Sequence, residues 1–331
     1  MPPSPLPVFL HLLADQKLVP GALRLELGGP AADPLAQMVA HPEFPEPIAH
    51  FTRVITQAQA ALLPLDTQAA LQAAGYQVVA DAAVFYTSQM AGVVLPTGAK
   101  WVDGTWFLAP PAKPAAAQAA SRALALRLVQ LVVADADARD IEDVLRQDPA
   151  LSYHLLRLVN SPGMGATRRI TSFSQAIMIL GRQQLRRWLN LMLFSARPDE
   201  PRSAMLLAQV MVRARSMELL AKDAGLDRAA QEMAFMAGLF SMLGILFGLP
   251  LPEVLKPLEI SEVLVQALLH RAGPLGNFLA ALECAEQCDV AGLVARLDGL
   301  QLTPAQFTQV SFEAHQWMLT MVVNVGGGHH E

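Results

Sequence analysis

Residues 148–162 have the sequence Asp-Pro-Ala-Leu-Ser-Tyr-His-Leu-Leu-Arg-Leu-Val-Asn-Ser-Pro, and this stretch decides the fold class. Asp148 is a suitable helix N-cap, and Pro149 suits the first helical position, where no backbone N–H is needed. The apolar positions that follow share one helical face: Leu151, Leu155, Leu158 and Val159. Ser161-Pro162-Gly163 then ends the predicted helix.

Helical spacing continues on both sides of this stretch. Another apolar face is formed by Leu124, Leu128, Leu131 and Val132. Further helices are predicted at residues 182–194, 204–224, 233–247 and 303–323. Because no strand pattern occurs after residue 120, we predict that residues 121–331 form one all-helical domain.

The first third of the chain has a different character, and 15 of the 24 Pro residues precede residue 115. We predict strands at 23–27, 77–80 and 100–108, and helices at 48–63 and 67–74. The Pro- and Ala-rich residues 111–120 have the composition of a linker. The expected fold is therefore α-dominated, with a small α/β module at residues 1–110, a linker at 111–120 and the helical domain at 121–331.

The overall composition is that of a globular protein. Of 331 residues, 53% are hydrophobic and 16% are charged, which excludes a disordered chain. The net charge of -5 argues against nucleic-acid binding by the chain as a whole. Two Cys residues suit a reducing compartment, and no basic segment precedes an apolar run at the N-terminus, so we expect a cytoplasmic protein.

Residues 233–252 contain no charged residue and are about as long as a membrane-spanning helix. Gly238, Gly244, Gly248 and Pro250 interrupt the run, and neither flank has a Lys/Arg cluster. We therefore expect a buried core helix and no membrane association.

Positive charge is concentrated in one part of the helical region. Residues 149–198 contain seven Arg and no Asp or Glu, so the rest of the chain sums to -12. Such asymmetry indicates a surface for an anionic partner, although the same Arg residues could lie on separate solvated faces. The candidate partner-binding residues are Arg157, Asn160, Met164, Arg168, Arg169, Arg186 and Arg187.

Motifs for enzymatic chemistry are missing from the sequence. It contains no glycine-rich dinucleotide loop, phosphate-binding loop or nucleophile elbow. Cys284 and Cys288 lie one helical turn apart, but no second pair of Cys or His stands at zinc-ligand spacing. We interpret the two thiols as small hydrophobic side chains and predict no catalytic residue, metal or cofactor.

The middle of the chain carries an ordered set of short motifs. They are Asp-Pro-Ala-Leu-Ser at 148–152, Leu-Leu-Arg-Leu-Val-Asn-Ser-Pro at 155–162, Ile-Thr-Ser at 170–172, Ala-Ile at 176–177, Leu-Gly at 180–181 and Leu-Arg-Arg-Trp at 185–188. This set resembles the HD-related output domain (HDOD) of bacterial signalling proteins. The resemblance runs from about residue 120 to residue 280 and implies a bundle of helices.

The same resemblance implies a relation to HD phosphohydrolases, which hold metal ions with a His and a His-Asp pair. Residues 237–244 resemble the helix that carries this pair, with Ser241 and Met242 in its place, and Arg215-Ser216 resembles the position of the first His. Met and Arg do not bind hard divalent cations, and a single Ser does not hold one. The resemblance therefore implies a protein without metal-dependent hydrolysis, which is not an enzyme.

The N-terminal region resembles parts of the EAL domain, the cyclic-di-GMP phosphodiesterase barrel that often precedes an HDOD. Residues 71–81 are similar to one helix–strand unit, and residues 103–110 are similar to its closing strand. About 110 residues are too few for an eightfold barrel of typically ~250 residues, and Ala82 follows Asp81 where the active family has a second Asp. This implies a truncated, degenerate EAL-like region, and an unrelated small α/β module stays open.

Together these interpretations predict a non-catalytic bacterial signal-transduction protein that regulates a protein partner through its HDOD. One alternative is a metal-dependent phosphohydrolase or cyclic-di-GMP phosphodiesterase. Another is a nucleotide or nucleic-acid binder that uses the Arg-rich residues 149–198. Binding of cyclic di-GMP without turnover would make the N-terminal module a sensor, and an exposed strand edge there favours a homodimer.

Charge reversal in the Gly-rich segment 163–170 tests the predicted partner surface. Arg168→Glu together with Arg169→Glu should weaken capture of the partner in a pull-down. The reason is that two cations that attract an anionic partner are replaced by two anions that repel it. The melting temperature should stay nearly unchanged, since exposed loop residues contribute little to stability. Undiminished capture by the double variant would contradict the assignment.

Overall fold

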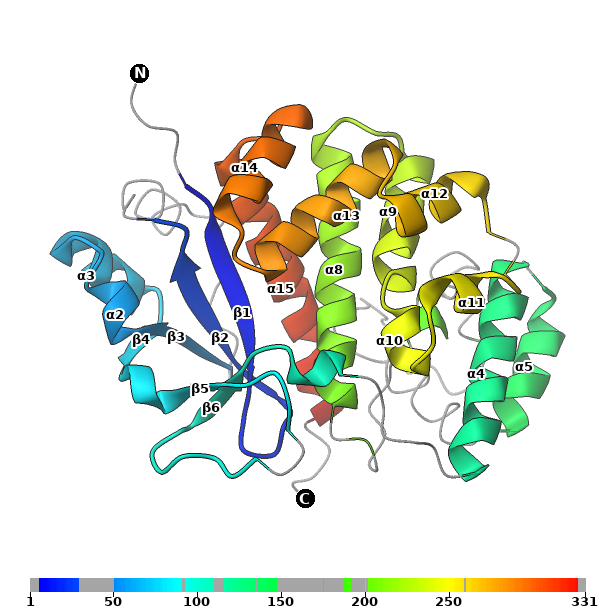
Figure 1. Ribbon diagram of the computed structural model, residues 1–331, viewed down its shortest axis with the longest axis horizontal. Helices are drawn as coiled ribbons and strands as arrows, with labels where there is room; N and C mark the ends of the chain where they lie inside the picture. The colour runs from blue at the N-terminus through cyan, green and yellow to red at the C-terminus, as the bar shows by residue number, and fades with distance from the viewer. Residues whose placement is uncertain are drawn as a thin grey trace.

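The computed structural model describes residues 6–29, 51–90, 93–109, 116–134, 136–147, 175, 187, 189–191, 200, 202–258 and 260–326. Within these ranges the protein is a six-stranded sheet packed on one side against a large group of helices (Figure 1). Residues 148–162, whose sequence predicts a helix, lie outside the described part of the chain.

The described strands and helices follow one another in two blocks. The strands are β1 (Val8–Ala14), β2 (Pro20–Leu27), β3 (Thr52–Thr56), β4 (Tyr76–Val79), β5 (Val84–Tyr86) and β6 (Trp101–Asp103). Among them lie the short helices α2 (Gln57–Ala60), α3 (Leu65–Ala73), η1 (Asp81–Ala83) and, just after β6, η2 (Trp106–Leu108). The second block holds α4 (Ala116–Val133), α5 (Ala138–Gln147), α8 (Ser203–Asp223), α9 (Arg228–Phe240), α10 (Leu243–Phe247), α11 (Leu251–Leu255), α12 (Glu262–His270), α13 (Gly273–Glu286), α14 (Val290–Gly299) and α15 (Pro304–Gly326).

The sheet is mixed and has the strand order β4-β3-β2-β1-β6-β5. β1 runs antiparallel to β2 and to β6, whereas the β2–β3, β3–β4 and β5–β6 pairs are parallel. β1 and β2 come first in the sequence and lie in the middle of the sheet, so the outer strands are added on both sides of them.

The alternating segment 23–27 is confirmed as part of β2. Leu23, Leu25 and Leu27 are buried, while Arg24 and Glu26 between them are only partly exposed. A strand with period-two side chains places these two polar residues together on the other face. The face that the sequence assigns to solvent is therefore partly covered, which positions both charges for the site described below.

Strand β1 lies against the helices α8, α13 and α15 (Figure 1). One continuous hydrophobic core includes Phe9, Leu12 and Ala14 of β1, Val102 of β6 and most of the inner faces of the helices. A smaller core beneath α2 and α3 includes Leu25, Ile55, Leu71 and Tyr76. The sheet therefore shares its main core with the helices.

This shared core corrects the predicted fold class. An all-helical bundle with a small, separate α/β module is wrong, because a six-stranded mixed sheet forms part of the same packed body. Strand β1 was not predicted from the sequence. Its residues, Val-Phe-Leu-His-Leu-Leu-Ala, form a nearly unbroken apolar run, which a search for period-two alternation does not reveal.

Two local predictions also need correction. Within the described residues 51–63, the predicted helix 48–63 is instead strand β3 followed by the single turn α2, because Thr52, Val54, Ile55 and Thr56 are β-branched and favour an extended chain. Residues 116–120 of the predicted linker 111–120 are helical, because α4 begins at Ala116, and the domain bounds stay a prediction.

Several helical predictions are confirmed. Residues 67–74 correspond to α3, 204–224 to α8 and 303–323 to α15, each within a few residues at the ends. Leu128, Leu131 and Val132 of α4 are buried as their spacing predicts.

The stretch Arg228–Phe247 is one segment among the described residues that is long and apolar enough to cross a membrane, by length and composition. Half of its apolar window is buried inside the protein, and a turn at Ser241-Met242 divides it into α9 and α10. A buried core helix passes the same test, so the expectation of no membrane association stays a prediction.

Helices α8 and α9 approach each other closely at Gly238. A Cβ atom there would lie 2.7 Å from the Cα of Ala214 and 2.9 Å from the carbonyl oxygen of Arg213, both backbone atoms of α8. Only glycine therefore permits this spacing, which brings Ser241, at the end of α9, next to the Arg213 side chain of α8.

Candidate functional site

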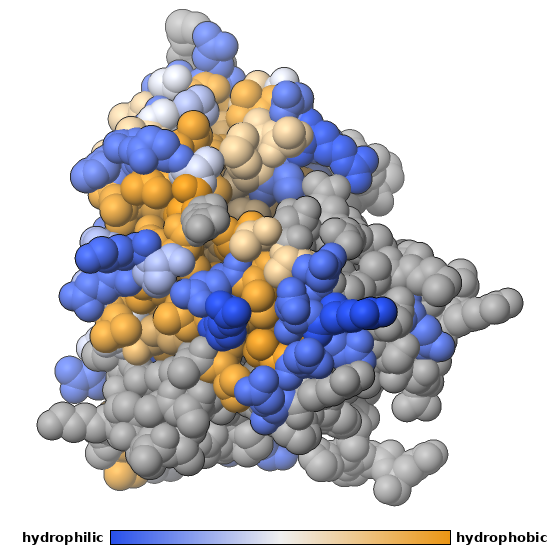
Figure 2. Space-filling model, turned by 90° about the vertical axis from the view of Figure 1, so that its right-hand side faces the viewer, coloured by the Kyte–Doolittle hydropathy of each residue, from blue (hydrophilic) through white to orange (hydrophobic). Residues whose placement is uncertain are grey.

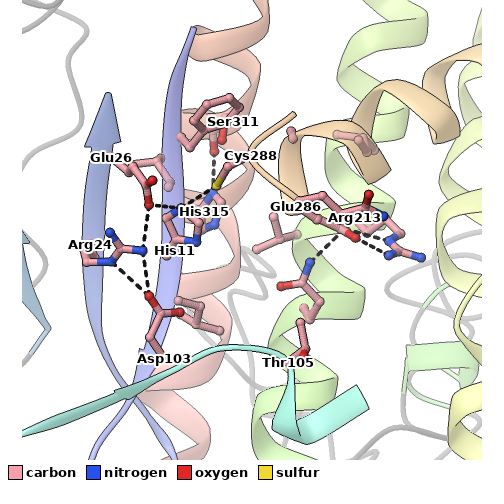
Figure 3. Close-up of a pocket in the computed structure, with 18 of the residues that line it drawn as sticks. His11, Arg24, Glu26, Asp103, Thr105, Arg213, Glu286, Cys288, Ser311 and His315 are labelled. Atoms are coloured by element: carbon pink, nitrogen blue, oxygen red, sulfur yellow. Dashed lines mark hydrogen bonds and ion pairs between the residues drawn. The ribbon is translucent and has the colours of Figure 1, made fainter. Parts of the chain in front are cut away.

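A cavity of about 680 Å³ lies between the sheet and the helices α8, α13 and α15 (Figure 3). Its wall combines strands from the start of the chain with helices from its end. The polar side chains that face it include His11, Arg24, Glu26, Asp103, Arg213 and His315.

Arg24 organises the sheet side of the cavity. Its Nη2 and Nε atoms donate to Oδ2 of Asp103 at 2.7 and 3.0 Å, and Nη2 also lies 2.8 Å from Oε2 of Glu26. Asp103 is only 6% exposed, so this fork neutralises a carboxylate that is costly to bury alone. Oδ1 of Asp103 accepts a bond from the backbone N–H of Gly104 at 2.6 Å, which fixes the carboxylate at the end of β6.

Gly104 is required at that corner for a conformational reason. Its φ is +108°, and a Cβ would lie 2.1 Å from the carbonyl oxygen of Thr87. The turn directs the chain from β6 into η2, so that Asp103 and Thr105 both line the cavity.

His11 of β1 sits beside Arg24 in the strand register. Its Nε2 atom lies 3.1 Å from Oε2 of Glu26 and 3.5 Å from Sγ of Cys288, which follows the end of α13. Burial opposes the charged imidazole, but the contacts with Cys288 and Glu26 outweigh it and raise the pKa of His11 to about 9. The same contact with His11, opposed by burial and aided by Arg24, lowers the pKa of Glu26 to about 2.

His315 of α15 faces the same cavity but behaves oppositely. Its Nδ1 lies 2.8 Å from the carbonyl oxygen of Ser311, so we assign the proton to Nδ1 as the donor. Burial, assisted by the positive charge of His11 and opposed by the Ser311 bond, lowers the pKa of His315 to about 4. The cavity therefore contains one charged and one neutral imidazole at neutral pH.

Arg213 dominates the helix side. Its Nε donates to Oε1 of Glu286 at 2.9 Å and its Nη2 forms a second, short contact with the same carboxylate. Its Nη1 donates to Oγ of Ser241 at 2.9 Å. Burial lowers the pKa of Arg213, but Glu286 outweighs that effect and keeps the guanidinium charged.

The three positions that resemble HD ligands are all engaged in other contacts. Arg215 pairs with Glu218 at 2.6 Å. Ser241 donates to the carbonyl oxygen of Gly238 at 2.6 Å and accepts from Arg213, while Met242 is fully buried in the core.

Of the seven predicted partner-binding residues, the structure describes only Arg187. Its guanidinium pairs with Glu218 and Glu232 and lies over the ring of Phe235, 4.2 Å from the centroid. Arg157, Asn160, Met164, Arg168, Arg169 and Arg186 lie outside the described residues, so partner binding by this set stays a prediction.

The sequence reading missed the residues that meet in this cavity. His11, Glu26 and Cys288 are too far apart in the chain for any spacing motif. Cys284 and Cys288 do pack against the hydrophobic core, as their interpretation as small apolar side chains implies, but the thiol of Cys288 also contacts His11. The detectable signal was the polar pair Arg24 and Glu26 within an otherwise apolar strand.

Comparison with known proteins identifies one part of the chain. Residues 121–259 match the HDOD domain family. The cyclic di-GMP phosphodiesterase CdgJ of Vibrio cholerae is 32% identical over 178 residues, which cover 54% of this chain and 40% of that protein. The uncharacterized protein YuxH of Bacillus subtilis is 28% identical over 131 residues, which cover 39% of this chain and 32% of YuxH.

A solved HDOD domain protein from Geobacter sulfurreducens superimposes with a TM-score of 0.37 at 18% identity, covering 66% of this chain and 93% of that one. At this level of likeness the domain assignment rests on the sequence match. Each sequence match covers less than half of the relative's own length. The chain therefore contains an HDOD domain at residues 121–259, and one relative is named a cyclic di-GMP phosphodiesterase.

Replacement of Arg24 should destabilise the protein, because the buried carboxylate of Asp103 loses its cationic partner. Arg24→Met leaves Asp103 without its guanidinium and should lower the free energy of unfolding by about 3 kcal/mol. Addition of Asp103→Asn should recover much of that loss, because the amide is uncharged and its oxygen still accepts from Gly104. Urea denaturation measures both, and a double variant no more stable than Arg24→Met would contradict the role of the pair.

The neutral His315 predicts a pH dependence of stability. Its pKa is about 4 in the folded protein and about 6.5 when unfolded, so its contribution is complete above pH 6.5 and is lost as pH falls toward 4. The loss amounts to about 3 kcal/mol. His315→Asn keeps a donor for the carbonyl oxygen of Ser311. Its free energy of unfolding should decline less steeply between pH 6.5 and 4 than that of the unmodified protein. His11 and Glu26 titrate in both proteins, so their contributions cancel in this comparison. Parallel curves would exclude this role.

Proposed function

We propose that this chain is a non-catalytic regulatory protein of cyclic-di-GMP signalling, in which the HDOD domain acts by binding a protein partner. The observation that carries the proposal is the position of Arg213, whose guanidinium bonds Ser241 and Glu286. Because Ser241 resembles an HD ligand position, a permanent cation stands where an HD enzyme would need a metal ion.

Electrostatics at this position supports a role without hydrolysis. The guanidinium of Arg213 and a metal ion bound beside Ser241 would repel each other. The low dielectric of a buried site strengthens this repulsion. Glu286, the carboxylate nearest to Arg213, is already used to neutralise the guanidinium. Arg215 and Met242 add no oxygen or nitrogen ligand of the kind that divalent cations prefer.

The charges around the cavity favour a protein partner over a cyclic dinucleotide. Among the described lining residues, Arg24, Arg213 and protonated His11 are matched by Glu26, Asp103 and Glu286. A dinucleotide with two phosphates is better held by unpaired positive charge. This cavity offers no such excess within the described part of the chain.

Exposed apolar side chains on the surface favour a protein interface. On the face shown in Figure 2, hydrophobic residues reach the surface between groups of hydrophilic ones. Val263 of α12 and Leu249 before α11 are examples of large apolar side chains that are more than half exposed. Apolar surface bordered by polar residues is typical of protein-binding sites.

Cyclic-di-GMP hydrolysis is the alternative, and the name of the Vibrio cholerae relative favours it. The match covers 40% of that protein, so its named activity need not reside in the shared part. A nucleotide or nucleic-acid binder that uses residues 149–198 has only the Arg-rich sequence to support it.

A turnover assay of the full chain separates these functions. With cyclic di-GMP and either Mg²⁺ or Mn²⁺, we expect no product above the protein-free rate. The variant Ser216→Ala with Ser241→Ala is the matched control, because it removes the remaining hydroxyls at the HD-like positions. Turnover by the unmodified chain that the control variant loses would contradict the proposal, whereas turnover that persists in the control would place hydrolysis elsewhere and equally contradict it.

A further inference from the structure

Three side chains with different donor atoms converge at the sheet edge of the cavity. Nε2 of His11, an oxygen of Glu26 and Sγ of Cys288 all lie within 4.8 Å of one another (Figure 3). Two of the contacts involve the same nitrogen atom, at 3.1 Å to Oε2 of Glu26 and 3.5 Å to Sγ of Cys288. Two ligand-type atoms therefore lie around Nε2 of His11, and a metal ion that binds there displaces the proton of the imidazolium.

The two separations measured from Nε2 of His11 are close to those of a tetrahedral metal centre. Zinc bonds of ~2.0 Å to nitrogen or oxygen and ~2.3 Å to sulfur place neighbouring ligands roughly 3.3 to 3.8 Å apart. The nitrogen–sulfur distance of 3.5 Å falls within this range, and the nitrogen–oxygen distance of 3.1 Å needs only a small increase.

We propose that His11, Glu26 and Cys288 form a binding site for a divalent cation of the zinc type. The donor set of one imidazole nitrogen, one carboxylate oxygen and one sulfur selects a borderline or soft metal such as Zn²⁺. It does not suit Mg²⁺ or Ca²⁺, which take oxygen ligands. The site is separate from the HD-like positions around Ser241 and does not depend on the proposed regulatory function.

The surroundings support metal binding in two ways. Oε2 of Glu26 contacts both His11 and Arg24, so Oε1 would bind the metal if Oε2 keeps Arg24, and Asp103 balances the charge of Arg24. Three protein ligands leave a fourth position for water, and His11, Glu26 and Cys288 all line the cavity.

The backbone conformation of Cys288 supports a specific role for its thiol. Cys288 adopts a φ of +54°, a conformation that L-residues seldom take and that glycine accepts readily. The chain nevertheless has a side chain there, and that side chain reaches His11.

Metal binding at this site would join distant parts of the chain. His11 and Cys288 are 277 residues apart, in the first strand and after the helix α13. Because the unfolded chain does not assemble these ligands, added metal should raise the melting temperature of the folded protein. The cation would thus act as a clamp between the sheet and the helices.

Cobalt substitution of the full chain tests the site. After treatment with a chelator, the protein is titrated with Co²⁺ and then with Zn²⁺. We expect about one Co²⁺ per chain with a near-ultraviolet sulfur-to-cobalt charge-transfer band, which Zn²⁺ removes. Cys284→Ser, one helical turn away, should keep this band, whereas Cys288→Ser should lose it and bind at least tenfold more weakly. No band in the unmodified chain, or equal spectra for the two Ser variants, would overturn the proposal.

A second measurement avoids dependence on the folding of variants. Alkylation of the unmodified protein, read by peptide mass spectrometry, should be slowed severalfold by Zn²⁺ at Cys288 and not at Cys284. His11→Gln should abolish this protection, whereas His270→Gln, at an exposed histidine, should preserve it. An alkylation rate of Cys288 that is unaffected by Zn²⁺ would contradict the site even if every variant folds.

Discussion

The packing of strand β1 against helices α8, α13 and α15 is the constraint on which the rest of the structure depends. It removes Phe9, Leu12 and Ala14 from water together with the inner faces of the helices, which provides the main hydrophobic driving force. The same contact encloses the polar side chains of β1 and β2. Each enclosed charge then needs a partner, because an unpaired buried charge is strongly destabilising.

The polar wall of the cavity follows from this requirement. Arg24 neutralises Asp103 and Glu26, and on the opposite wall Glu286 neutralises Arg213. The pairs are strong structural elements and leave little free charge for an anionic ligand. The two histidines differ in protonation because a carboxylate and a thiol beside His11 offset its burial and raise its pKa, whereas burial dominates at His315 and lowers its pKa despite the bond to Ser311.

Arg213 also links the two regions of the chain. It belongs to α8, which packs on β1 and β2 on one side and on α9 on the other. Gly238 allows α9 to approach so closely that Ser241 reaches the guanidinium of Arg213. Packing contacts of α8 therefore connect the sheet with the HD-like positions around Ser241.

Local patterns in the sequence determined much of the helical half. The apolar spacing of α4, α8 and α15 predicted these helices, and the motifs at 148–188 identified the HDOD domain. The alternating residues of β2 were also predicted, because one of its faces is buried and the other is polar. These features depend on neighbours within a few residues, which a sequence displays directly.

Only the tertiary structure decided the rest. The apolar run of β1 is compatible with helix or strand until its partners are known, and the segment 52–56 became a strand by pairing with β2 and β4. The cavity likewise brings His11 and Glu26 to Cys288 across most of the chain. No spacing in the sequence records such a meeting, because the burial of the sheet on the helices creates it.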